Sequence, residues 1–446
     1  MRILFVENRY ATRLYEVVAP HLAQAGHEVH WMVQNPQFAP RMRDVHVLRF
    51  PTASEMRTPS DADPLYARLR RSDRGYRYFA TGDAHYEHYA GEISRVLDDV
   101  RPNLVVGEST QAHELITIEL CKRRGINYLF PLATAYPPGR LFFYREDSMM
   151  TVGGSGKAMP ADAAEALIDG VNNRSIVPTY MKKQGRFDGR RLVRHLTDRV
   201  RTSLGWLRGE RFATPAPWRK LQVDRAHARH RQRWSKLAKQ RAGLTGPYVL
   251  FPLHMQPECS IDVWGQQWNN QAAILQRAAA ALAKIGISVV VKPNPKAKYD
   301  IDRQLCDVAE SSPNVYSLDF SVPMRNVWSE ATAILSVTGT VLLEAVFSGK
   351  TAFSFTDIKR ATLPGVILLN SPEEISDHLQ IKIPEDQVLV VRARARIILD
   401  THHACSYGVE WIDPLWSAER ITDAYGQDLA HAFLDIINQS NGPDVR

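Results

Sequence analysis

Short apolar runs alternate along the chain with segments whose apolar positions recur every three or four residues. Arg2–Val6 and Glu28–Val33 are typical of buried strands, and Ala11–Ala25 between them has the period of a helix that Gly26 ends. A strand, a helix and a strand in this order predict a parallel sheet. The same alternation returns between Tyr248 and Phe355. The pattern therefore predicts an α/β fold with two doubly wound domains.

The chain has 446 residues, which is too many for a single hydrophobic core. We expect residues 1–180 to form the first α/β domain and residues 181–245 to form a basic helical bridging segment. Residues 246–400 are expected to form the second α/β domain. Residues 401–446 are expected to be helices that cross back to the first domain.

Composition places the chain among ordinary globular proteins, with 44% hydrophobic and 23% charged residues. No apolar run reaches transmembrane length, and the N-terminus is typical of a strand rather than a signal peptide. Four scattered cysteines without metal-ligand spacing indicate free thiols in the cytoplasm. The net charge of +8 favours an anionic partner such as a nucleotide, a phospholipid surface or an acidic glycan.

A polar turn follows the apolar run Tyr248–Phe251 and holds His254, Gln256 and Glu258. Pro257 prevents the turn from continuing as a strand ladder or a helix interior. Ligands of open α/β sheets bind at the carboxyl ends of strands, so this turn is a candidate site. The alternative is a first strand followed by a plain surface loop.

A second strand end has the pattern of an anion site. The strand up to Val337, which includes Ser336, is followed by Thr338, Gly339 and a helix that opens at Thr340. Unpaired amides at a helix start bind phosphate, and a glycine lets the backbone come close to it. Glu344 lies one helical turn later, within reach of a ribose. A helix that is merely capped by threonine is the alternative.

Three further candidate groups follow strand ends. Lys292, Asn294 and Lys296 follow the strand Ile287–Val291. The two lysines would supply positive charge for a phosphate, and Asn294 could donate a hydrogen bond. In the first domain, Glu108 and His113 follow the strand Asn103–Val106, although Ser109, Thr110 and Glu108 could simply cap the next helix. Arg140 and Arg145 follow a Pro-Pro-Gly turn that we interpret as a loop over the site.

The motifs FPLHMQPECSID, KPNPK and SVTGTVLLEAVFSGK resemble the bacterial glycosyltransferases of GT-B fold that build capsule and lipopolysaccharide. That group includes retaining β-Kdo transferases and sialyltransferase-like enzymes that use CMP-activated sugars. The matching motifs span Tyr248–Phe355, and the first domain matches in architecture only. The resemblance implies two Rossmann-like domains facing a cleft, and transfer of an ulosonic acid such as Kdo to a bacterial surface glycan, with retention.

The resemblance also implies roles for the candidate residues. Glu258 takes the acidic position near the chemistry, with Asp262 as second choice and His254 as a neighbour that could tune or replace it. A His-Pro pair that commonly contacts the nucleotide phosphate in the group is Asn294-Pro295 here. The residues expected to hold the nucleotide sugar are Gln256, Lys292, Asn294, Ser336, Thr338, Gly339, Thr340 and Glu344.

The remaining expectations concern acceptor, metal and cofactor. Glu108 and His113 are assigned to the acceptor, and Arg140 and Arg145 to the acceptor or to a carboxylate of the donor sugar. The chain has no Asp-x-Asp motif, so we expect neither a metal ion nor a cofactor besides the donor. A CMP-linked donor fits this, because its single phosphate needs less countercharge than a diphosphate.

Other functions stay open at this point. A UDP-sugar-dependent transferase and a nucleotide-sugar epimerase or hydrolase share the architecture. The basic stretch Met181–Ala242, with Trp206, Trp218 and Trp234 interleaved, also suits a non-catalytic protein that binds anionic surfaces. We expect a nucleotide-sugar donor, a glycan or lipid-linked glycan acceptor and a peripheral contact with the inner membrane. Nucleic acid is not an expected partner, because such a binder has no need of three phosphate-type strand ends.

Overall fold

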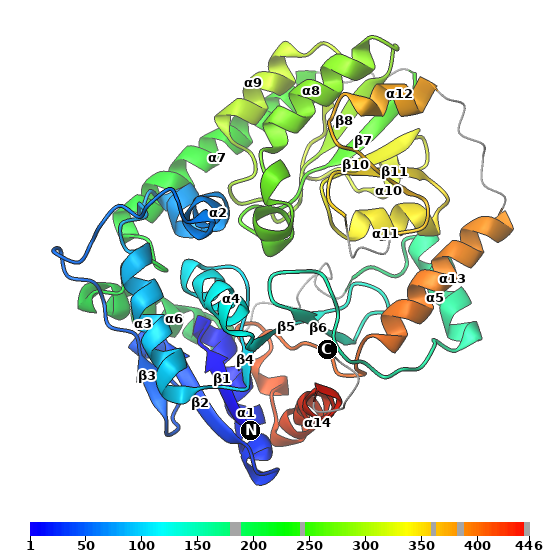
Figure 1. The fold of residues 1–446 in the computed structure, drawn as a ribbon. Coiled ribbons are helices and arrows are strands. Elements are labelled where there is room, and N and C mark those ends of the chain that lie inside the picture. The colour runs from blue at the N-terminus through cyan, green and yellow to red at the C-terminus, as the bar shows by residue number, and fades with distance from the viewer. Residues whose placement is uncertain (179–188, 241–245, 358–362, 381–387, 441–446) are drawn as a thin grey trace. The chain divides into compact units, whose positions relative to one another are not determined.

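The computed structural model describes residues 1–178, 189–240, 246–357, 363–380 and 388–440 (Figure 1). Its contacts divide the chain into two compact units. Unit 1 comprises residues 1–159, 178–219 and 400–446, and unit 2 comprises residues 160–177 and 220–399. Within the described residues, no helix is long and apolar enough to cross a membrane.

Unit 1 contains a six-stranded sheet in the order β3-β2-β1-β4-β5-β6. Its strands are β1 (Arg2–Val6), β2 (Glu28–Val33), β3 (Val45–Val47), β4 (Leu104–Val106), β5 (Asn127–Ala133) and β6 (Leu141–Arg145). The first five strands pair in parallel, and β6 adds an antiparallel edge.

Helices cover both faces of this sheet. They are α1 (Thr12–Gln24), α2 (Pro64–Ser72), α3 (Tyr86–Val100), α4 (Ala112–Arg124), α6 (Gly189–Arg208) and α14 (Asp423–Ser440). The C-terminal α14 packs on α1, whereas α2 and α3 pack on α4 on the opposite face (Figure 1). A capping box between Gln111 and Glu114 starts α4, and Gly125 in the left-handed conformation ends it.

Unit 2 contains a second six-stranded sheet, in which all pairs are parallel. Its order is β12-β11-β10-β7-β8-β9. Its strands are β7 (Tyr248–Pro252), β8 (Ser288–Lys292), β9 (Val315–Ser317), β10 (Ala333–Ser336), β11 (Thr351–Ser354) and β12 (Val366–Leu368).

The helices of unit 2 also lie on both faces. They are α5 (Ala161–Asn172), α8 (Gln271–Ala283), α9 (Arg303–Ser311), α10 (Arg325–Trp328), α11 (Thr340–Phe347) and α12 (Glu374–Gln380). Helices α9 and α12 pack on α8, and α5 packs on α11 (Figure 1). The boundary between the units runs through α7 (Pro217–Gln240) and α13 (Val388–Ala404).

Each sheet has the strand order of a Rossmann-like fold, so the predicted α/β class with two doubly wound domains is confirmed. In both sheets, the second and third strands along the chain lie on one side of the first strand, and the fourth to sixth strands lie on its other side. The strand order therefore reverses between β1 and β4 in unit 1 and between β7 and β10 in unit 2. Ligands of such sheets bind beside the reversal, at the carboxyl ends of the strands.

Two details differ from the predicted layout. Residues 160–177, predicted in the first domain, belong to unit 2, because α5 packs on α11 and carries Asp169 to within 2.8 Å of Arg392. Trp234, predicted on a basic surface, is fully buried in the core of unit 2, where its Nε1 donates to the carbonyl of Leu318 over 2.9 Å.

Candidate functional site

The candidate site of unit 2 lies at the strand-order reversal between β7 and β10. His254 follows β7, and Ser336, Val337 and Thr338 form the end of β10 and its loop. Because β7 and β10 are paired neighbours in the sheet, these segments meet at its carboxyl edge. The first and third strand ends that the sequence predicted are thus brought into direct contact.

His254 is the centre of this contact, and its ring is about nine-tenths buried. The backbone amide of Thr338 donates to its Nε2 over 3.2 Å. Since an amide N–H can only donate, Nε2 accepts and the neutral ring carries its proton on Nδ1. Burial lowers the pKa of His254 to about 4, so the ring is neutral at physiological pH.

The proton on Nδ1 lies beside the start of α11. A β-carbon built on Gly339 would lie 3.7 Å from Nδ1 and 3.0 Å from Cε1 of His254. Within the described residues, Nδ1 makes no hydrogen bond. His254 therefore offers a neutral N–H donor next to the amides of a helix N-terminus, a combination that suits an anion.

Gly339 occupies the N-cap position of α11 with φ of 95°, a conformation that side chains disfavour. The hydroxyls around it hold the loop. Ser336 Oγ donates to the carbonyl of Thr338 over 2.7 Å, and Thr338 Oγ1 donates to the carbonyl of Ser260 over 3.1 Å. Both hydroxyls, predicted to hold the nucleotide sugar, thus shape the glycine turn. Thr340, the first residue of α11, is half-buried.

A chain of amides ties His254 to the turn that carries the candidate carboxylates. Gln271 accepts from the backbone of His254 over 2.8 Å and donates to its carbonyl over 3.1 Å. The same amide donates to Gln256 over 3.0 Å, and Gln256 donates to Asp262 over 2.8 Å. Asp262 then accepts the backbone amide of Glu258 over 3.1 Å. These bonds fix the turn relative to β7.

The two predicted carboxylates have different surroundings. Asp262 is buried, and both of its oxygens accept hydrogen bonds from the turn. Glu258 as a residue is exposed, although protein atoms surround its carboxylate. Desolvation by these atoms raises the pKa of Glu258 to about 7. The hydrogen bond from the Ser260 side chain and the charge of Lys296 lower the pKa, and the carboxylates of Asp262 and Asp300 raise it. Glu258 is therefore the carboxylate that is accessible for chemistry.

The loop after β8 supplies less free charge than the sequence suggested. The Lys292 ammonium is buried and donates to the carbonyl of Pro293 over 2.7 Å, and burial lowers its pKa. Asn294 accepts the backbone amide of Lys296 over 2.9 Å. Both side chains brace the loop, and their predicted contact with the nucleotide stays a prediction.

Glu344, predicted near a ribose, forms an ion pair with Arg174, which follows α5. The guanidinium of Arg174 also lies 4.1 Å from the centre of the Trp328 ring. Sequence reasoning missed Arg174, because nothing local to it signals a partner 170 positions away. This pair connects α11 to α5 on one face of the sheet.

Unit 1 has its own polar cluster at the reversal between β1 and β4. Asn8 follows β1 and donates to Glu108, which follows β4, over 3.0 Å. Asn8 also donates to Glu114, a fully buried residue that accepts the amides of Thr110 and Gln111 over 2.8 and 2.9 Å. Burial raises the pKa of Glu108, and Glu114 acts in the same direction.

His113 belongs to the same cluster. Its Nε2 lies 2.9 Å from the carbonyl of Glu7, so Nε2 donates and Nδ1 is left without a hydrogen-bond partner in a buried position. The structure therefore brings Glu108 and His113 together at one sheet edge, as predicted. Glu7, Asn8 and Glu114 were missed, although Glu7 and Asn8 are the first polar residues after β1.

The predicted arginines lie elsewhere in unit 1. Arg140 donates to Ser406 Oγ over 2.7 Å and to the carbonyls of His403 and Ser406 over 2.9 and 2.6 Å, so it fixes the chain after α13. Arg145 ends β6, and its backbone amide closes a turn by donating to Met150 over 2.8 Å. A role of either arginine towards a sugar carboxylate stays a prediction.

Among the described residues, no cluster of three or more His, Cys, Asp or Glu side chains is arranged to hold a metal ion. The candidate chemistry is therefore built from a helix start, a neutral histidine and a carboxylate. The predicted independence from metal ions is a matter for experiment.

Comparison with known proteins gives likeness of structure only. No family model matches the chain, and no curated protein matches it. A UDP-GlcNAc 2-epimerase from Neisseria meningitidis bound to UDP-GlcNAc is 11% identical, with 97% of this chain and 100% of that chain covered and a TM-score of 0.32. A glycosyltransferase from Rickettsia africae is 10% identical, with 99% of each chain covered and a TM-score of 0.30. A calicheamicin glycosyltransferase is 15% identical over 97% of this chain and 98% of that chain, with a TM-score of 0.31.

Proposed function

We propose that the protein is a glycosyltransferase that moves a sugar from a nucleotide-linked donor to a glycan acceptor. The observation that carries this proposal is that Gly339, the start of α11 and the Nδ1 of His254 lie together at one strand end. In the proposal, the phosphate of the donor lies against this helix start. It accepts the His254 N–H and the first amides of the helix.

Departure of a nucleotide from an anomeric carbon develops negative charge on the leaving phosphate and positive charge on the sugar ring. Donors that are fixed before the reaction stabilise the leaving phosphate without reorganisation. His254 meets this requirement, since the amide of Thr338 donates to Nε2 and holds the ring between β7 and β10.

Glu258 supplies the carboxylate in the proposed mechanism. It acts as nucleophile if the configuration is retained, or as base towards the acceptor if it is inverted. Either role requires the ionised form. Because the pKa of Glu258 is raised to about 7, the rate should rise with pH through this value and level off above it.

For the donor we propose a CMP-linked ulosonic acid such as Kdo, transferred with retention to a lipid-linked or surface glycan in the cytoplasm. The supporting argument is electrostatic. Of the two lysines predicted at this edge, Lys292 donates to its own loop, which leaves Lys296, and the neutral His254 adds no charge. A single phosphate suits such a site better than a diphosphate, and UDP-linked donors remain the alternative.

The test combines binding and turnover. CMP and UDP are compared by calorimetry, and transfer from CMP-Kdo or a UDP-sugar is followed by mass spectrometry of acceptor glycans. Glu258→Gln should lower turnover by at least ~100-fold while nucleotide affinity stays nearly constant. Glu330→Gln, another exposed glutamate of unit 2, is the matched control and should keep full activity. A stable Glu258→Gln protein with normal turnover would disprove the catalytic assignment.

A second candidate is a nucleotide-sugar epimerase or hydrolase. The observation that favours it is the separate cluster of Glu108, Glu114 and His113 at the sheet edge of unit 1, which provides a second set of acid–base groups. Such an enzyme consumes or epimerises its nucleotide sugar without an acceptor. Proton NMR of the nucleotide sugar incubated with protein alone decides between the two reactions.

A further inference from the structure

Helix α6 of unit 1 packs on the protein through its polar side. Arg194 lies 3.2 Å from Glu419, and Asp198 lies 2.7 Å from Arg13. Gly205 is fully buried against the Asn35 side chain, which a β-carbon at Gly205 would meet at 2.4 Å. This arrangement is the reverse of an ordinary surface helix, whose apolar side faces the core.

The opposite side of α6 carries aliphatic side chains that point away from unit 1. Their exposed fractions run from 39% for Leu204 to 68% for Leu207. At 3.6 residues per turn they occupy an arc of about 120° along the whole helix. We call this surface the aliphatic stripe, and it consists of Leu192, Val193, Leu196, Val200, Leu204 and Leu207.

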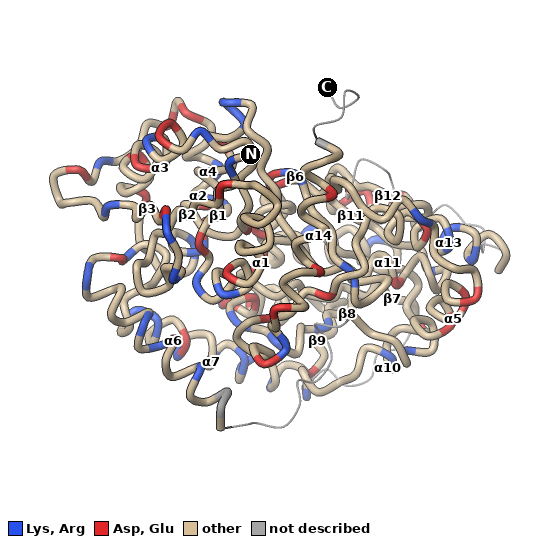
Figure 2. Tube along the Cα trace, turned by 90° about the horizontal axis from the view of Figure 1, so that it is seen from below, with Lys and Arg blue, Asp and Glu red and all other residues tan. Residues whose placement is uncertain are grey.

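Positive charge borders the stripe. Arg199 follows one edge of the arc and Arg208 the other, and both are exposed. Blue Lys and Arg positions lie along the trace near the label of α6 (Figure 2). The segment 189–221 contains only two acidic residues. Asp198 pairs with Arg13, and Glu210 is fully buried and accepts the amides of Phe212 and Ala213 over 3.1 and 2.8 Å. The outward side of α6 is therefore apolar and cationic.

The C-terminal end of α6 leads to a cavity of about 720 Å³ within unit 1. Trp206 and Trp218 line it with their rings edge to face 5.0 Å apart, and Arg211 lies 5.1 Å from the Trp206 ring. Trp218 is 58% exposed. Tryptophan beside arginine is typical of side chains that rest at the headgroup level of a bilayer.

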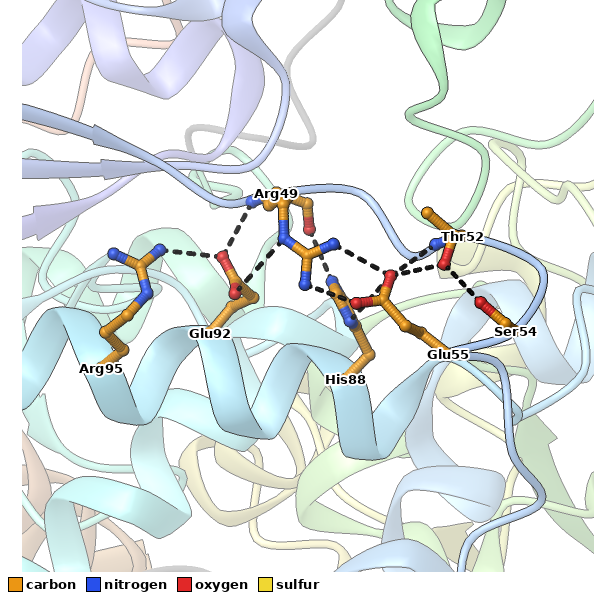
Figure 3. Close-up of polar contacts among 7 residues, drawn as sticks. All are labelled: Arg49, Thr52, Ser54, Glu55, His88, Glu92 and Arg95. Atoms are coloured by element: carbon orange, nitrogen blue, oxygen red, sulfur yellow. Dashed lines mark hydrogen bonds and ion pairs between the residues drawn. The ribbon is translucent and has the colours of Figure 1, made fainter.

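The wall of this cavity that comes from residues 50–56 is held rigidly. Arg49 donates to both oxygens of Glu55 over 2.9 and 2.6 Å, and the amide of Thr52 donates to Glu55 over 2.9 Å. From α3, His88 binds the carbonyl of Arg49 over 2.8 Å and Glu92 accepts its amide over 3.2 Å (Figure 3). These hydrogen bonds tie this wall of the cavity to α3.

We propose that α6 lies flat on an anionic lipid bilayer, with the aliphatic stripe in the boundary between headgroups and acyl chains. Arg199 and Arg208 then meet lipid phosphates at the two edges of the stripe. A second copy of the chain fits this surface less well. Pairing two stripes would bring arginines of like charge together, and the outward side offers no carboxylate to neutralise them.

Vesicle flotation tests this proposal with the full-length protein. Vesicles contain phosphatidylcholine alone or phosphatidylcholine and phosphatidylglycerol in equal parts, from about 0.05 M to about 0.5 M NaCl. The protein should bind the anionic vesicles at low salt and lose binding as salt screens the arginines. The variant Leu196→Ser/Val200→Ser/Leu204→Ser should bind at least ~10-fold more weakly, because three aliphatic side chains no longer enter the boundary.

The matched control is Val388→Ser/Leu389→Ser on α13, whose side chains are 71% and 78% exposed outside the stripe. It should bind like the wild type. The proposal is overturned if the wild type ignores anionic vesicles at low salt, or if the stripe variant and the control bind equally. Sedimentation that shows a dimer which only the stripe variant dissociates would overturn it in favour of self-association.

A second measurement covers the case in which the stripe variant misfolds. A solvent-sensitive fluorophore on Ser203→Cys, an exposed position within the arc, should shift to shorter wavelength with anionic vesicles. Wild-type protein labelled on its own cysteines is the reference. An unchanged emission spectrum at Ser203→Cys would refute insertion of the stripe.

Discussion

Replacing Gly339 by alanine tests the anion site with a single methyl group. Gly339 has φ of 95°, where a residue with a β-carbon costs about 1–3 kcal/mol. The new methyl group would also lie 3.0 Å from Cε1 of His254, so the ring must move by a few tenths of an ångström. The ring cannot move freely, because the amide of Thr338 donates to Nε2 and the ring is buried.

Gly286→Ala separates backbone strain from this contact. Gly286 follows α8 with φ of 71°, and a β-carbon there would meet nothing within 4 Å. Both variants should unfold at lower temperature, by roughly 4–8 °C if the strain is about 2 kcal/mol and unit 2 unfolds cooperatively. Only Gly339→Ala also displaces the His254 donor and obstructs the approach of a phosphate to α11.

The assay is thermal unfolding with and without nucleotide. A ligand at about 100 times its dissociation constant raises the free energy of unfolding by about 2.7 kcal/mol. Wild type and Gly286→Ala should show the full rise in melting temperature with CMP or UDP, and Gly339→Ala should show little or none. If Gly339→Ala retains the same rise as Gly286→Ala, the nucleotide does not bind where we place it.

Two further predictions concern stability. Folding lowers the pKa of His254 from 6.5 to about 4, so between these pH values the unfolded state binds one proton more than the folded state. The free energy of unfolding should therefore fall as pH drops from about 6.5 to about 4. Urea titrations of His254→Gln at several pH values should show a smaller fall over this range, and a fall equal to that of the wild type would contradict the prediction. Arg174→Ala removes the partner of the Glu344 carboxylate, whose side chain is 11% exposed, and should lower the free energy of unfolding by about 3–5 kcal/mol, measured by urea denaturation. Arg174→Ala/Glu344→Gln should recover part of that loss, and strict additivity would show that the pair does not stabilise the protein.

The sequence predicted the strand ends well, for a physical reason. A buried parallel strand is a run of apolar residues, and the first polar residues after it must lie at the sheet edge, as His254 and Glu108 do. What the sequence could not give is the direction of each side chain. Ser336 and Thr338 are typical ligand-binding hydroxyls, but Ser336 donates to a carbonyl of its own turn and Thr338 donates to the carbonyl of Ser260 in the segment after β7.

Contacts between segments that are distant in the sequence could not be predicted from it either. The pair Arg174–Glu344 depends on α5 packing against α11, which no local pattern encodes. For α6, the periodicity predicted an amphipathic helix correctly, yet periodicity cannot tell which side faces the protein. Trp234 was misplaced for a related reason, because the basic residues around it on α7 hid an apolar side that belongs to the core.

The hydrogen bonds of unit 2 distinguish the roles of Asp262 and Glu258, both of which the sequence offered as candidate catalytic carboxylates. The two oxygens of Asp262 accept hydrogen bonds from the Gln256 side chain and from the backbone amide of Glu258, so this carboxylate stabilises the turn. The backbone amide of Glu258 donates to Asp262, and the carboxylate of Glu258 is hydrogen-bonded by the Ser260 side chain. Gln271 and Gln256 connect this turn to the backbone of His254. A base needs a carboxylate oxygen that can still take up a proton. Both oxygens of the buried Asp262 already accept hydrogen bonds from the turn, so the exposed residue Glu258 meets this requirement better.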